Sequence, residues 1–313
     1  MKSLFANIYF IFFVAILAIA PVYSQIDSAV QIQEGFRLLQ SEDFQSAVSA
    51  FSAVLRAEPD NDKARLGLAI AFVGVEKFAE ASREIAKLLA RSPKDARLLE
   101  MAAQTFWAQK RFSETEKVLQ RRIALGDAPA ELWALYGDAL DVQKKTIEAV
   151  SAYEKAVKAK PDSINYRYAL GSLYWKQIRY DDATREFTEI LKRAPNEPRA
   201  SFNLGDIYLT NGDAAKAVPF LEISAKKFPQ EFDTRFALGR AYSAVKKYPQ
   251  AITELEAAVK LRPEIAEGFY QLGLALQKIG RRKEAKTAFK KAQELQKAKR
   301  DSEAPTTVPK NNQ

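Results

Sequence analysis

The stretch YALGSLYWKQIRYDDATREF, residues 168–187, holds five aromatic side chains and one glycine within twenty residues. Within it, Gly171 is followed three residues later by Tyr174, and Ala183 is followed four residues later by Phe187. Spacings of three and four residues place side chains on one face of a helix. The stretch therefore predicts two helices that approach each other closely at the two small residues, with the large residues filling the space around them.

The same pattern returns along the chain at intervals of 34 residues. The repeated glycines are Gly137, Gly171, Gly205, Gly239 and Gly273. The alanines twelve residues after them include Ala183, Ala217 and Ala251. Continuing the register towards the N-terminus gives eight units, which cover residues 28–299 and start at 28, 62, 96, 130, 164, 198, 232 and 266. Because one helix pair cannot bury its own apolar face, the repeat predicts an all-α stack of helix pairs.

This 34-residue pattern resembles the tetratricopeptide repeat (TPR) family. The resemblance implies a right-handed superhelical solenoid of antiparallel helix pairs. It also implies that a peptide or protein segment binds in a concave groove lined by the first helix of each unit. The third unit matches least well, because Thr115 and Asp127 stand where the repeat has alanine and proline. Pro219 falls inside the second helix of the sixth unit and is expected to bend it.

Aromatic residues recur where the resemblance places the groove. Position 5 is aromatic in each of the last four units, and position 12 is tryptophan in two units. The candidate protein-binding residues are Trp107, Tyr168, Trp175, Phe202, Asn203, Asp206, Phe236, Arg240 and Tyr270. Aromatic rings with a few polar groups suit a peptide groove. The alternative is that the position 5 rings pack partly against the neighbouring repeat. No unit has the Lys at position 5 and Asn at position 9 of the chaperone-binding carboxylate clamp, so that binding mode is not expected.

The composition argues against an enzyme. The chain has no cysteine and no histidine, which removes thiolate nucleophiles, disulfides, zinc–sulfur sites and the commonest general base. Asp138 and Asp141 lie three residues apart and could form a catalytic pair or a cation site, but two acids on a solvated helix face are commoner. We therefore expect a non-catalytic scaffold or adaptor with no cofactor, no metal and no small-molecule substrate.

The N-terminus predicts export. Residues 1–24 have a lysine at position 2, a charge-free apolar run over residues 4–20 and small residues before the bond after Ser24. These features are typical of a secretory signal peptide, and the alternative is an uncleaved membrane anchor formed by residues 4–20. The sequence thus predicts an exported protein, in a bacterial periplasm or secreted.

The C-terminal end is strongly basic. Residues 278–300 contain ten Lys or Arg and two Glu, whereas the whole chain has a net charge of +9. The basic surface includes Arg281, Arg282, Lys286 and Lys290. The simplest interpretation is a polar capping helix, and the alternative is contact with an anionic membrane surface or a polyanion. The export signal argues against nucleic acid as that polyanion. Residues 300–313 lack apolar periodicity and are expected to be disordered.

Overall fold

The computed structural model describes residues 27–303, and within that range every regular element is an α-helix. The predicted signal peptide, residues 1–24, and residues 304–313 lie outside the described part of the chain. Among the described helices, none combines the length and the apolar character needed to cross a bilayer. The chain divides into two compact units at Ala159 and Lys160, and we describe each by itself.

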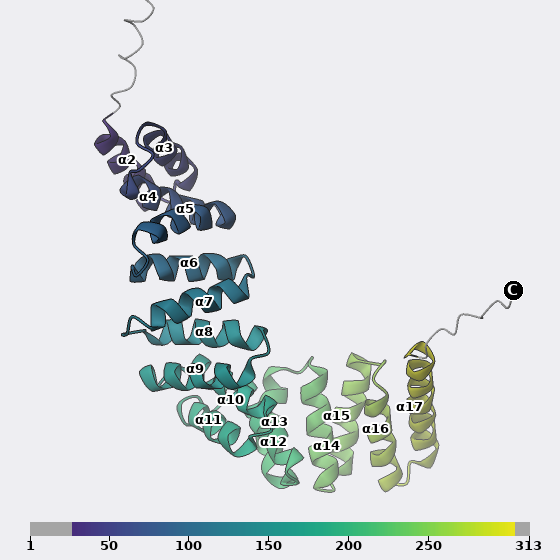
Figure 1. The fold of residues 1–313 in the computed structure, drawn as a ribbon. Coiled ribbons are helices and arrows are strands. Elements are labelled where there is room, and N and C mark those ends of the chain that lie inside the picture. Colours follow the sequence, from purple (N-terminus) through teal and green to yellow (C-terminus); the bar gives the residue numbers. More distant parts are fainter. Residues whose placement is uncertain (1–26, 304–313) are drawn as a thin grey trace, which may run out of the picture. The chain divides into compact units, whose positions relative to one another are not determined.

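The N-terminal unit contains four antiparallel helix pairs that follow one another in chain order (Figure 1). The first helices of the pairs are α2 (Ser28–Gln40), α4 (Asp62–Gly74), α6 (Ala96–Ala108) and α8 (Ala130–Val142). The second helices are α3 (Phe44–Ala57), α5 (Phe78–Arg91), α7 (Phe112–Ile123) and α9 (Thr146–Ala159). In the weakly matching third pair, α7 is two residues shorter than the other second helices of this unit.

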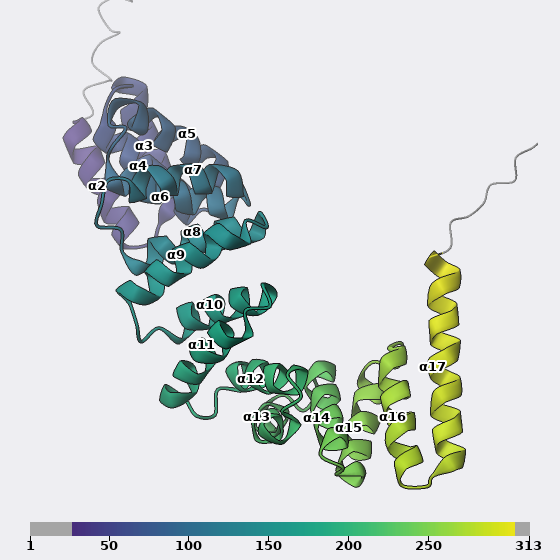
Figure 2. The same ribbon diagram turned by 60° about the horizontal axis from the view of Figure 1, so that its bottom comes forward.

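The C-terminal unit also contains four pairs. Its first helices are α10 (Ile164–Lys176), α12 (Pro198–Thr210), α14 (Phe232–Ala244) and α16 (Ala266–Lys278), and its second helices are α11 (Tyr180–Arg193), α13 (Ala214–Lys227), α15 (Tyr248–Leu261) and α17 (Arg282–Glu303). Helix α13 continues through Pro219. Helix α17 extends beyond the end of α16 (Figure 2). The sequence placed residues 300–303 in a disordered tail, whereas in the structure they form the last turn of α17.

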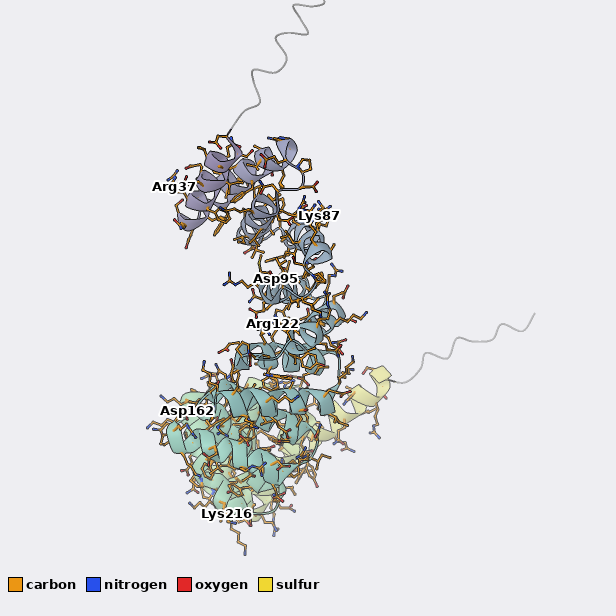
Figure 3. The ribbon with its side chains drawn as sticks, turned by 60° about the vertical axis from the view of Figure 1, so that its left-hand side comes forward. Arg37, Lys87, Asp95, Arg122, Asp162 and Lys216 are labelled. Atoms are coloured by element: carbon orange, nitrogen blue, oxygen red, sulfur yellow. The ribbon has the colours of Figure 1, made fainter. Side chains whose placement is uncertain are left out.

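A left-handed residue joins the two helices of each pair, and side-chain caps begin several of the helices. Asp95, labelled in Figure 3, accepts a hydrogen bond of 3.0 Å from the backbone N–H of Leu98 and so caps α6. Between the two helices of every pair, one residue has a positive φ. These residues, at position 15 of the eight units, are Glu42, Glu76, Lys110, Lys144, Ile178, Gly212, Lys246 and Gly280. The left-handed residue ends the first helix and turns the chain into the second one.

Close approach of the two helices depends on a small residue at position 8, which is glycine in six repeats and Ala69 or Ala103 in the other two. A Cβ atom on Gly137 would lie 2.6 Å from the Tyr153 ring, and one on Gly205 would lie 2.7 Å from Leu221. The alanines at position 20 have no solvent exposure in six of the eight units, Ala183, Ala217 and Ala251 among them. In each of the two compact units, the apolar core therefore lies between the two helices of every pair and continues to the next pair.

A buried ion pair recurs in three units and has no counterpart in the repeat pattern read from the sequence. The Arg167 guanidinium lies 2.6 Å from the Glu186 carboxylate and donates a second hydrogen bond to the backbone carbonyl of Pro161 at 2.8 Å. The equivalent pairs are Arg65 with Glu84 and Arg235 with Glu254. In each case the arginine also bonds the carbonyl of the preceding proline, at Pro59 or Pro229. The pair thus fastens the start of one repeat to its own second helix.

Candidate functional site: the face of the first helices

In each compact unit, the side chains at positions 5, 6, 9, 12 and 13 of the first helices share one side of these helices, and we call this surface the first-helix face of that unit. In the C-terminal unit, Tyr168 of α10 is tied into this surface on several sides. Its ring centroid lies 5.8 Å from that of Phe187, and its hydroxyl accepts a hydrogen bond of 3.2 Å from the Asn203 amide. The Arg199 guanidinium lies 4.7 Å from the ring centroid. Tyr168 therefore links α10 to α12 and is half-buried.

The other position 5 rings divide between packing and exposure. Phe236 stacks on Phe232, with ring centroids 5.3 Å apart, and Phe202 packs against the apolar core, so both are half-buried. Tyr270 touches Phe289 with one side, yet 43% of it is exposed. In the C-terminal unit, the aromatic surface open to a partner at position 5 is therefore mainly that of Tyr270.

A hydrogen bond between Trp175 and Asp206 joins α10 to α12 on this face. Trp175 is 40% exposed, and its indole N–H donates to the Asp206 carboxylate. Burial raises the pKa of Asp206, and the attraction of the Arg240 guanidinium and the Trp175 hydrogen bond oppose that rise without cancelling it. Arg240 itself is exposed, with its guanidinium 5.6 Å from the Phe236 ring centroid. The polar residues Asn203, Asp206 and Arg240 thus come from α12 and α14 and lie beside aromatic rings.

Each unit has a pocket on its first-helix face. The pocket of the N-terminal unit has a volume of about 300 Å³ and is lined by Ile70, Val73, Phe78, Met101, Gln104 and Thr105. The pocket of the C-terminal unit has a volume of about 430 Å³, and its lining includes Arg240, Ser243, Tyr248, Gln271, Leu274 and Ala275. The residue numbers of these two sets differ by 170, which is five times 34. The pockets are therefore the same repeat feature, formed by the first helices of two adjacent pairs and the first residue of the second helix between them, Phe78 or Tyr248.

Of these pocket residues, Arg240 was predicted from the sequence as a protein-binding residue, and the others were not. The prediction relied on aromatic rings at the groove positions, whereas most of the pocket lining is aliphatic or carries small polar groups. Trp107 of α6, which it did select, is half-buried and packs edge-to-face against Phe112 at 5.1 Å. The 34-residue register could have related the two pockets to each other, because their lining residues occupy the same repeat positions.

Other candidates have local partners. The Asp138 carboxylate accepts a hydrogen bond from the Tyr153 hydroxyl, and burial raises the pKa of Asp138. Within residues 27–303, no group of three or more acidic residues is placed to hold a metal ion. On the basic surface, Arg281 donates to Glu284 at 2.7 Å, and the Lys290 ammonium lies 3.8 Å from Glu294. Arg282 and Lys286 are exposed on α17. The arrangement on the first-helix face suits binding.

Comparison with known proteins identifies the repeat. Models of the tetratricopeptide repeat match residues 38–105, 101–164, 168–232, 229–280 and 266–299. Among solved structures, YrrB, a TPR protein with an unusual peptide-binding site, is similar with a TM-score of 0.53 and 18% identity, over 60% of this chain and 100% of that chain. MamA from Desulfovibrio magneticus RS-1 is similar with a TM-score of 0.51 and 24% identity, over 54% of this chain and 96% of that chain. At these identities the likeness concerns the fold. Among curated protein sequences, none matches the chain.

Proposed function

This chain belongs to the tetratricopeptide-repeat family, and we propose that it is a non-catalytic scaffold that holds an extended segment of a partner protein against its first-helix face. The observation that carries the proposal is the pair of repeat-equivalent pockets on that face. Pockets of about 300 and 430 Å³ are large enough for single side chains of a bound peptide. Within a unit, the partner's backbone would run along the first-helix face and one of its side chains would enter the pocket of that unit.

Exposed aromatic surface supports the proposal. Trp175 and Tyr270 present partly exposed rings on the same face as the pocket of the C-terminal unit. Tryptophan and tyrosine are enriched among residues that dominate binding energy. YrrB, whose fold is similar, has a peptide-binding site. Tyr168, Phe202 and Phe236 are poorer probes of binding, because their replacement would also remove packing within the unit.

The test is selection of binding peptides from a random display library by the full chain, followed by fluorescence anisotropy with the labelled peptides. Val73→Glu places a charge in the N-terminal pocket, and Ala244→Trp fills the C-terminal one. We expect at least one of the two to weaken binding tenfold or more, since burying an unpaired charge or losing the cavity removes the contact (about 1.4 kcal/mol per factor of ten).

The matched control is Ile147→Glu. Ile147 lies on the second helix α9 with 78% of its surface exposed, so the same kind of change there should leave binding and the thermal melt as they are. Failure to select any peptide would contradict the proposed function. Selected peptides that bind both pocket variants as tightly as the unmodified chain would contradict it too.

We further propose that the scaffold works outside the cytoplasm. The support is the sequence of residues 1–24, with its single lysine and apolar run. Fractionation of the native host, with antibody against the repeat region, should find the chain in the periplasm or the medium if the segment is cleaved. It should find the chain in the membrane fraction if residues 4–20 remain as an anchor. A cytoplasmic pool alone would refute export.

The basic end of the chain supports a second candidate, binding of a polyanion or an anionic membrane surface. The supporting observation is that Lys283, Lys286 and Lys291 are exposed on α17 without a carboxylate within 4.0 Å among the described residues. This candidate predicts retention on heparin that weakens steeply with salt and is lost when these three lysines are changed to glutamine. Retention that survives those changes would rule it out.

A further inference from the structure

The two equivalent pockets differ in chemistry at all six shared positions. At two of them the C-terminal pocket is the more apolar, since Leu274 and Ala275 replace Gln104 and Thr105, and at the other four it is the more polar. In the N-terminal pocket, four of the shared positions carry Ile70, Val73, Phe78 and Met101. In the C-terminal pocket the same four positions carry Arg240, Ser243, Tyr248 and Gln271. Each of these four differences replaces an apolar group by a hydrogen-bond donor, and none introduces a carboxylate. The C-terminal pocket is therefore equipped for a ligand group that is rich in acceptors.

A second cation completes the contrast. Lys278 lines the C-terminal pocket, where the N-terminal unit has Ala108 at the equivalent position. Within residues 27–303, neither Arg240 nor Lys278 has a carboxylate within the 4.0 Å of an ion pair. Both are exposed at the pocket rim. Two positive charges over one pocket without a contacting counter-charge favour an anionic occupant.

The nearby carboxylates are engaged elsewhere. Asp206 attracts Arg240 but accepts the Trp175 hydrogen bond, and its carboxylate is not within ion-pair distance of Arg240. Glu267 accepts a hydrogen bond of 2.7 Å from the Gln271 amide. Neither acid lines the pocket. A carboxylate supplied by a ligand would therefore meet cations that the chain itself leaves available.

The floor of the pocket is apolar. Leu209 and Leu274 are half-buried and Ala275 is buried, whereas the two cations are exposed. A side chain with methylene groups near its backbone and a carboxylate at its tip matches this layering, because the methylenes cover the apolar floor while the tip reaches the cations.

We propose that the C-terminal pocket binds an acidic side chain, glutamate better than aspartate, of the partner segment, with Arg240 and Lys278 as its charged contacts. The proposal rests on the proposed function, since it names what one pocket of the first-helix face recognises. The N-terminal pocket, which has Ile70 and Ala108 at the positions of the two cations, serves as the internal comparison.

The test uses a random-peptide display library whose variable segment is flanked on both sides by fixed sequence, so that any selected carboxylate is a side chain. The full chain and the double variant Arg240→Gln/Lys278→Gln are each used for selection. We expect glutamate to be enriched at one position by the unmodified chain and not by the double variant. For one selected peptide, we expect the double variant to weaken binding by about tenfold to a hundredfold, as for loss of charge-assisted bonds. Glutamate→glutamine in the peptide should have a similar effect.

The matched control is Lys260→Gln, an identical loss of charge at an exposed position of α15 outside the pocket, which should leave affinity unchanged. Binding to the unmodified chain should also weaken with added salt, whereas binding to the double variant should depend on salt much less. Selected peptides without an acidic preference, or with one that survives in the double variant, would overturn the inference while leaving the proposed function standing. Selection of no peptide at all would remove the proposed function and the inference together.

Discussion

The buried Arg167–Glu186 pair gives the sharpest test of how this repeat is stabilised. The two side chains are 12% and 8% exposed, and their charged atoms lie 2.6 Å apart. Arg167→Leu leaves the Glu186 carboxylate buried, with Arg185 at 3.7 Å as its remaining cation. Breaking a buried pair on one side costs about 3–5 kcal/mol. The loss of the hydrogen bond to Pro161 adds about 1 kcal/mol.

The chain itself suggests a compensating change. The third unit has Leu99 and Val118 at the positions of Arg167 and Glu186, and both are buried. The double variant Arg167→Leu/Glu186→Val copies that solution, so no charge is left without a partner. We expect it to cost only about 1–2 kcal/mol, mainly through the lost bond to Pro161, which is much less than either single change.

Urea titration followed by far-UV circular dichroism measures all three variants. The coupling energy between the two changes should be at least about 2 kcal/mol, as is usual for contacting groups of one network. The same comparison at Arg235–Glu254 tests whether the result belongs to the repeat. Single variants that cost less than about 1 kcal/mol, or costs that add up in the double variant, would refute the reasoning, because they would mean that the buried charges do not depend on each other.

Three further predictions follow from the packing. Ile178→Gly should stabilise the chain by about 1 kcal/mol in a urea titration, because a β-branched residue at φ 61 is strained, and a loss of stability would contradict this. Gln109→Leu should cost about 1–3 kcal/mol, since its amide bonds the Phe78 carbonyl and the Ser82 hydroxyl; an unchanged midpoint would exclude that role. Asp206→Asn should stabilise the chain at pH 7 and progressively less towards pH 4. The raised folded pKa of Asp206 means that its stability contribution is present below the unfolded pKa and is lost as pH rises through the folded pKa; a pH-independent difference would contradict this.

The sequence predicted the fold well because the repeat enforces it. Glycine at position 8 and alanine at position 20 report directly on helix contact, so Gly171 and Ala183 were enough to place a helix pair. The buried ion pairs were missed because Arg167 and Glu186 are 19 residues apart and only three units carry them. The left-handed residue of the turn was missed for a related reason. Only Gly212 and Gly280 mark it with the residue type that this conformation favours.

The candidate site was harder to predict, because exposure depends on contacts between repeats. Tyr168 and Tyr270 both occupy position 5, and each contacts an aromatic ring of its own repeat. Tyr168 also accepts a hydrogen bond from Asn203 and contacts the Arg199 guanidinium, both on the next first helix. Within residues 27–303, no first helix packs beside Tyr270 in this way, and 43% of Tyr270 is exposed. The periodic pattern is identical in the two cases, so it could not separate them.

Neighbouring residues of one helix illustrate how this fold can vary its ligands. A Cβ atom on Gly239 would lie 2.6 Å from Leu255, so any larger side chain there must displace the core. Arg240, the next residue, is exposed and lines the pocket. A change at Gly239 therefore acts on folding, whereas a change at Arg240 acts on what the pocket accepts. Arg240→Ile, which copies Ile70 of the N-terminal pocket, should leave the thermal melt nearly unchanged and shift peptide selection from acidic to apolar side chains. A large loss of stability in that variant would mean that recognition and folding are not separated in this way.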